Sequence, residues 1–323
     1  MKLRNARMFG SYNKIKLAIA SASLVLTVVA SVAADCDEIL GRFNQAINEG
    51  RENDAQELVD KIAISAQCGQ YQIPTQRRLA ALRLNAAQSI MARGRPSADF
   101  ERLLNTAEAT EVLWQASATL GEVRFGERRF LEAAQAYDRA IEIIKNETRT
   151  PSAPSKFEIE GLIMRAAQAR LLAANHGPHS SGIYVAAARD QRDGSIGGYY
   201  SRSVRGIVPR ALPIPITFEY GTTAFTTVGQ DAIRELVAAL KEQRPGSITL
   251  IGHTDVRGSA DFNLKLSRER AVAVANSLRE AGINMPMETL GKGANEPMPL
   301  PETSGLTQED IYALNRRVEW RRN

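Results

Sequence analysis

The feature that most constrains this fold is a change in hydrophobic period along the chain. Between residues 36 and 175, apolar residues recur at helical spacing and strand signals are scarce. After residue 213 the pattern alternates between short β-rich runs and amphipathic helices. The sequence therefore predicts an α+β chain of two parts, an all-α helical hairpin or repeat region followed by a compact α/β domain.

Seven helices are expected in residues 35–175, and prolines stand near several of their ends, where a helix tolerates them. We find no catalytic constellation in this region, so we expect a scaffold or a protein-docking surface. The expected helices span residues 37–49, 53–67, 75–92, 97–109, 111–125, 130–145 and 156–174, and the prolines are Pro74, Pro96, Pro151 and Pro154.

One helical pair has a more specific pattern of small and aromatic residues. Gly121 and Ala133 would let the two helices approach, while Phe130 and Tyr137 would fill the gap between them. The segment resembles one tetratricopeptide repeat, although Arg124 stands where that family has a tyrosine. A plain helical bundle, in which the alanines merely pack, is the alternative.

The two cysteines are expected to form a disulfide. Cys36 and Cys68 stand at the outer ends of the first two expected helices, which meet in an antiparallel hairpin. Closing a loop of this length stabilises a fold by about 3–4 kcal/mol in the chain-entropy model. A metal site is not expected, because no Cys-x-x-Cys occurs and the histidines are not grouped with the cysteines.

The net charge of +5 is concentrated in the N-terminal segment. Residues 1–34 hold five basic side chains and no acid, and the rest of the chain holds 36 of each sign. A basic start, an apolar stretch and a small-residue exit are typical of a secretory signal peptide. An uncleaved anchor is the alternative. The balanced remainder does not favour a nucleic-acid partner, and no later segment is apolar enough to span a bilayer.

Residues 176–212 are rich in glycine and arginine and lack sustained periodicity. We interpret them as a solvated interdomain linker. Residues 213–323 are expected to form a sandwich of helices on a small mixed sheet, with strands near 214–218, 248–251, 288–291 and 315–322 and helices at 228–243 and 263–281.

Five short motifs follow one another in residues 213–323. They are Phe218-Glu-Tyr-Gly-Thr222, Gly252-His-Thr-Asp-x-x-Gly258, Phe262-Asn-x-x-Leu-Ser-x-x-Arg-Ala271, Gly291-x-Gly-x-x-x-Pro297 and Asn315-Arg-Arg-Val-Glu319. Each is weak alone, but in this order and at this spacing they resemble the OmpA-like peptidoglycan-binding family.

The resemblance implies a site for the diaminopimelate residue of the peptidoglycan stem peptide, with no cofactor. The free end of that residue carries an ammonium and a carboxylate, which Asp255 and Arg270 would bind as opposite charges. By the same resemblance, Asn263 and Thr254 support this pair. Further supporting positions are Thr222, Arg316 and Arg317, and at most one of the two adjacent arginines should face the site, because neighbours on a strand point to opposite sides.

The leading interpretation is a non-catalytic periplasmic protein that anchors a helical scaffold to the cell wall, on the outer-membrane side of a Gram-negative envelope. An adaptor whose helical region binds a protein partner is compatible with it. A wall hydrolase is the third reading, but Gly-x-Ser-x-Gly, His-Glu-x-x-His and a spare cysteine are all missing from the sequence.

Overall fold

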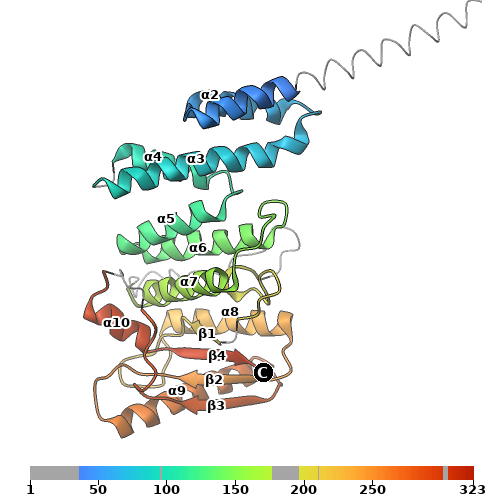
Figure 1. Cartoon of the computed structure of the whole chain (residues 1–323). Helices are drawn as coiled ribbons and strands as arrows, with labels where there is room; N and C mark the ends of the chain where they lie inside the picture. Colours follow the sequence, from blue (N-terminus) through green and yellow to red (C-terminus); the bar gives the residue numbers. More distant parts are fainter. Residues whose placement is uncertain (1–35, 95–96, 177–195, 210, 301–304) are drawn as a thin grey trace, which may run out of the picture.

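The computed structural model describes residues 36–94, 97–176, 196–209, 211–300 and 305–323. The expected signal segment lies outside these residues. Helices stack in chain order from α2 at one end of the molecule to α7, which lies against the α/β domain at the other end (Figure 1). Within the described part of the chain, no helix is long and apolar enough to cross a membrane.

The expected helices of the N-terminal region are all present, beginning with a helix over residues 36–48. The main difference concerns Pro74, which lies in the first turn of α3 and not between helices. A first-turn N–H has no helical acceptor, so proline loses nothing there. The labelled helices are α2 Glu52–Ile64, α3 Gln72–Ala92, α4 Ala98–Glu108, α5 Trp114–Gly126, α6 Phe130–Lys145 and α7 Lys156–His176.

The disulfide between Cys36 and Cys68 is confirmed. Their Cα atoms lie 5.8 Å apart, and both side chains are buried against Ile62 of α2. Farther along the stack, α5 and α6 approach closely, because a Cβ on Gly121 would lie 2.5 Å from the ring of Tyr137. The small-residue contact expected between these two helices is therefore present. The resemblance of the α5–α6 segment to a tetratricopeptide repeat stays a prediction.

The C-terminal part is an α/β domain with a four-stranded mixed sheet, as expected. The strands are β1 Ala211–Ile214, β2 Ile248–Gly252, β3 Met287–Gly291 and β4 Val318–Arg322, in the order β1-β4-β2-β3. Strands β2 and β3 are parallel, and β4 is antiparallel to both β1 and β2. Its helices are α8 Thr227–Gln243, α9 Ala260–Glu280 and α10 Gln308–Asn315.

The first strand differs from the expected 214–218. It ends at Ile214, and Phe218 makes only an isolated bridge to Phe225. The ladder ends there because β4, the only partner of β1 in the described sheet, begins at Val318, opposite Ile214.

Helix α9 lies directly on β2. A Cβ on Gly252 would stand 1.9 Å from the carbonyl oxygen of Ser267, so only glycine permits this approach. The contact fixes the distance between the end of β2 and the middle of α9, the two elements that carry the candidate site.

The described part of residues 176–212 differs from the expected solvated linker. Tyr199 and Tyr200 have no exposed surface, and they belong to a core that runs from Phe125 of α5 to Trp320 of β4. The backbone N–H of Tyr199 donates to buried Asp138 of α6 at 3.0 Å. Helices α5–α7 and the α/β domain therefore share one hydrophobic core.

Candidate functional site

A pocket of about 630 Å³ opens where β2 ends. Its walls come from the segment after β1, the loop between β2 and α9, and the two helices α9 and α10. The end of α7 also reaches it through Asn175, so both parts of the chain contribute to the pocket. Charged and aromatic residues on its walls are Phe218, Glu219, Tyr220, Asp255, Arg257, Phe262, Arg270, Glu309 and Arg316.

The β2–α9 loop has a defined shape before any ligand is considered. Gly258 has φ +92, a conformation that favours glycine. The hydroxyl of Ser259 caps α9 by accepting from the backbone N–H of Phe262 at 3.2 Å. The amide of Asn263 donates to the backbone carbonyls of Arg257 and Asp255, at 3.0 and 3.3 Å. Asn263 therefore holds the loop that carries Asp255.

Asp255 is a buried carboxylate held by two arginines. Its Oδ2 accepts from Arg257 Nη2 at 2.5 Å and from Arg316 Nη1 at 3.0 Å. Its Oδ1 accepts the backbone N–H of Arg257 at 3.0 Å. Burial alone would raise the pKa of Asp255, but these hydrogen bonds hold it below its ordinary value. The group is therefore an anion at neutral pH.

Arg270 is a buried cation that forms no salt bridge with any described residue. It is 4 % exposed, its Nε donates to the carbonyl oxygen of Thr222 at 3.0 Å, and its guanidinium carbon lies 4.8 Å from the centre of the Phe218 ring. Among the described residues, no carboxylate lies within 4.0 Å of it. Burial, and then the charge of Arg316, lower the pKa of Arg270 to about 10.

The other predicted residues divide into those at the pocket and those away from it. Thr254 lines the pocket, and its buried hydroxyl meets no partner in the described chain. Arg316 faces the pocket, whereas Arg317 turns away to pair with Glu319 at 2.7 Å. Thr222 contributes its backbone carbonyl to Arg270 and is not part of the pocket wall.

The lining residues that the sequence analysis did not assign to the site include Asn175, Arg257 and Glu309. Arg257 stands two positions after Asp255, so a search for local ion pairs would have found it. Nothing local marks Asn175 or Glu309, which arrive from α7 and α10 through tertiary packing.

Comparison with known proteins bears on the C-terminal part. Residues 217–309 match the model of the OmpA family. The probable lipoprotein YiaD of Escherichia coli K12 is 31% identical over 138 residues, which cover 42% of this chain and 60% of that protein. The peptidoglycan-associated lipoprotein of Legionella pneumophila is 29% identical over 104 residues, which cover 32% of this chain and 56% of that protein. The chain thus spans less than two thirds of these relatives.

Among solved structures, the peptidoglycan-associated lipoprotein from Burkholderia pseudomallei is 26% identical, and the match covers 35% of this chain and 90% of that one, with a TM-score of 0.29. Residues 217–309, within the α/β part of the chain, are therefore identified as an OmpA family domain, and an all-helical N-terminal region precedes this part.

Proposed function

We propose that this pocket binds the free end of diaminopimelate in the peptidoglycan stem peptide, and that the chain thereby anchors its helical region to the cell wall. The observation that carries the proposal is Arg270, a buried guanidinium that faces the pocket and has no carboxylate of the described chain within 4.0 Å. A buried charge is costly unless it is paired, so a ligand carboxylate is the partner that this arrangement favours.

The second half of the ligand, its ammonium, requires an acceptor, and Asp255 supplies one. Its carboxylate already binds Arg257 and Arg316. The side chain of Arg257 is 40% exposed and that of Arg316 is 23% exposed. We infer that Arg257, the more exposed of the two, gives up its place when an ammonium binds. A zwitterion then satisfies Asp255 and Arg270 together without changing the net charge of the pocket.

The names of similar proteins support a place in the cell envelope. They include an outer membrane protein A and a peptidoglycan-associated lipoprotein. We propose that the protein is periplasmic and associated with peptidoglycan on the outer-membrane side.

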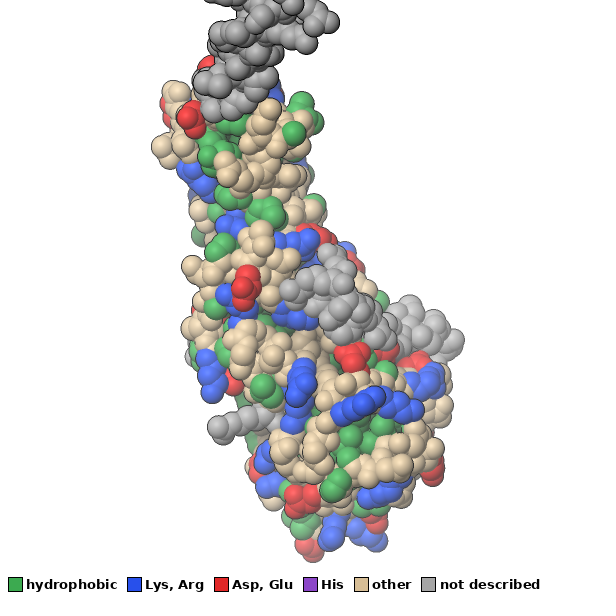
Figure 2. Space-filling model, turned by 90° about the vertical axis from the view of Figure 1, so that its right-hand side faces the viewer, with side chains coloured by type: hydrophobic (Ala, Val, Ile, Leu, Met, Phe, Trp, Pro, Cys, Tyr) green, Lys and Arg blue, Asp and Glu red, His purple; other side chains and the backbone are tan. Residues whose placement is uncertain are grey.

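Acidic and basic side chains are interspersed on the face shown in Figure 2, without a large area of one sign. We also propose that the helical region docks a protein partner, which a pull-down with the full mature chain would identify.

The test of wall binding is sedimentation of the mature chain with purified sacculi, in the presence and absence of free meso-diaminopimelate. Wild type should sediment, and the free amino acid should release it. Asp255→Asn and Arg270→Met should stay in the supernatant. Arg268→Met is the matched control, because Arg268 is exposed on the same helix and does not line the pocket. Equal sedimentation of wild type, Asp255→Asn and Arg270→Met would refute the proposed site.

A further inference from the structure

Two side chains of the helical region converge on one buried carboxylate of the α/β domain. Asp310 of α10 has no exposed surface. Arg128 Nη2 donates to its Oδ1 at 2.9 Å, and Arg128 Nη1 contacts its Oδ2. The Nε2 atom of His176, the last residue of α7, lies 2.5 Å from the same Oδ1. We refer to these three residues as the junction cluster.

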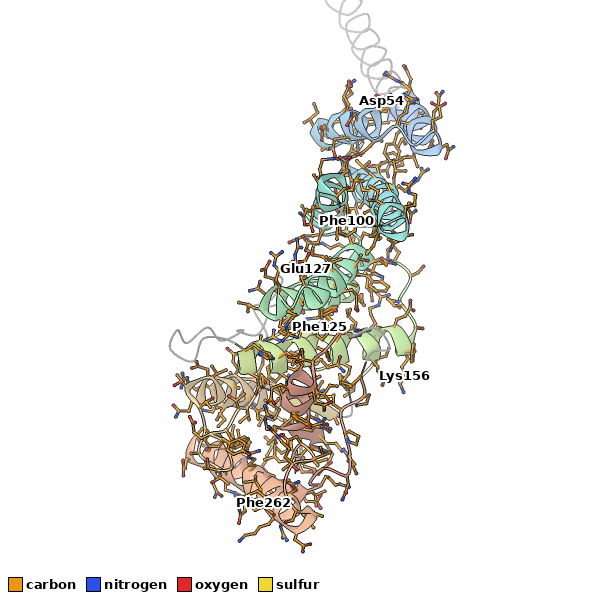
Figure 3. The ribbon with its side chains drawn as sticks, turned by 90° about the vertical axis from the view of Figure 1, so that its left-hand side faces the viewer. Asp54, Phe100, Phe125, Glu127, Lys156 and Phe262 are labelled. Atoms are coloured by element: carbon orange, nitrogen blue, oxygen red, sulfur yellow. A yellow bond between two sulfur atoms is a disulfide. The ribbon has the colours of Figure 1, made fainter. Side chains whose placement is uncertain are left out.

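Arg128 occupies a backbone conformation that is unfavourable for its residue type. It lies in the turn between α5 and α6 with φ +62, in the left-handed region where glycine is the usual choice. Phe125 and Glu127, labelled in Figure 3, mark the chain directly before it. A strained backbone conformation persists where interactions of the residue offset its cost. Here the side chain of Arg128 forms an ion pair with Asp310, 182 positions away in sequence.

Helix α10 extends from the junction cluster to the ligand pocket. At its start, Thr307 and Asp310 form a reciprocal capping box. Glu309 lines the pocket and accepts from Arg316 Nη2 at 2.9 Å. Arg316, directly after the helix, donates through Nη1 to Asp255 at 3.0 Å. One short helix therefore holds the junction cluster and the network around Asp255.

We propose that Arg128 is a positioning residue for the ligand pocket: by binding Asp310 it fixes α10, and α10 keeps Arg316 on Asp255. This inference rests on the proposed function for its binding readout. Because Arg128 comes from the α5–α6 turn, the helical region would then be part of the wall-binding site. The physical link is a rigid capped helix with ion pairs at both ends.

The first test is amide hydrogen exchange on the ligand-free mature chain. In Arg128→Gln, exchange in residues 308–316 should rise by about tenfold, because the capped helix loses the ion pair that joins it to the α5–α6 turn. Arg128→Lys keeps the charge and should restore much of the protection. Arg129→Gln is the control in the same turn, since within the described chain the ion pairs of Arg129 are with Glu127 and Glu132. Unchanged exchange in Arg128→Gln overturns the inference whether or not diaminopimelate binds.

The second test is calorimetric titration of the same variants with free meso-diaminopimelate. Arg128→Gln should bind about 5- to 10-fold more weakly than wild type, while Arg129→Gln binds as wild type does. In an Arg316→Gln background, Arg128→Gln should cause no further loss, because both changes act on one path. Additive losses would overturn the positioning role. Failure of wild type itself to bind would instead refute the proposed function, and the exchange result would still decide the inference.

Discussion

Replacing Arg270 by methionine should stabilise the fold while removing ligand binding. Methionine matches the length of the arginine stem and suits the interior of α9. The folded pKa of Arg270 is about 10, against an ordinary value of 12.5. At neutral pH the group is charged in both the folded and unfolded states, so this lowering measures how strongly the folded state disfavours the charge.

The lowering corresponds to about 3 kcal/mol, at about 1.4 kcal/mol per pKa unit. Methionine also loses the hydrogen bond to Thr222, worth about 1 kcal/mol, and the contact with the Phe218 ring, worth about 1 kcal/mol. The net gain in the free energy of unfolding is therefore about 1 kcal/mol. This corresponds to a rise in melting temperature of about 2–4 °C for a chain of this size.

Urea and thermal unfolding of the mature chain, followed by circular dichroism, measure this change. Binding should fall by about 30-fold or more, because the ligand carboxylate loses its charged partner. The control Arg268→Met should stay within about 0.5 kcal/mol of wild type. A loss of more than about 1 kcal/mol in Arg270→Met would contradict the reasoning, since it would show that the arginine has a stabilising partner within the fold.

Three further predictions concern stability. Replacing Cys36 and Cys68 together by alanine should lower the free energy of unfolding by about 3–4 kcal/mol, measured by urea unfolding, and a reductant should then have no further effect. Asp138→Ala removes the carboxylate partner of the fully buried Arg170 and should cost about 3–5 kcal/mol in the same assay. Burial lowers the pKa of His253 from 6.5 to about 3. Because the unfolded state binds a proton at His253 below pH 6.5 and the folded state does not, the free energy of unfolding should fall as the pH drops from 6.5 toward 3, by up to about 1.4 kcal/mol per pH unit. His253→Gln should flatten that slope in unfolding curves measured across this range.

The helices and most strands could be predicted because their signals are local. The spacing of apolar residues in α6 and α9, and the β-rich run of β2, each lie within one element. Two segments differ from the prediction. Strand β1 ends at Ile214, earlier than the apolar pattern suggested, and the buried Tyr199 and Tyr200 lie in a glycine-rich stretch whose polar composition resembled a linker.

The candidate site was predictable only in part. Asp255, Asn263 and Arg270 follow from motif order, and the structure places all three at one pocket. The role of Asn263 in holding the loop, and the occupation of Asp255 by Arg257 and Arg316, required coordinates. Side-chain hydrogen bonds depend on distances of a few tenths of an ångström, which spacing in sequence does not determine.

The sequence by itself determined the order of secondary structure, the helical and α/β parts, the Cys36–Cys68 pair and the charge balance, because each depends on neighbours along the chain or on composition. Only the tertiary structure decided that α5–α7 share a core with the sheet and that Arg128 meets Asp310 across 182 positions. That contact depends on how α7 packs beside β1 and α10. Packing of this kind is set by the shapes of surfaces that form only after the elements exist.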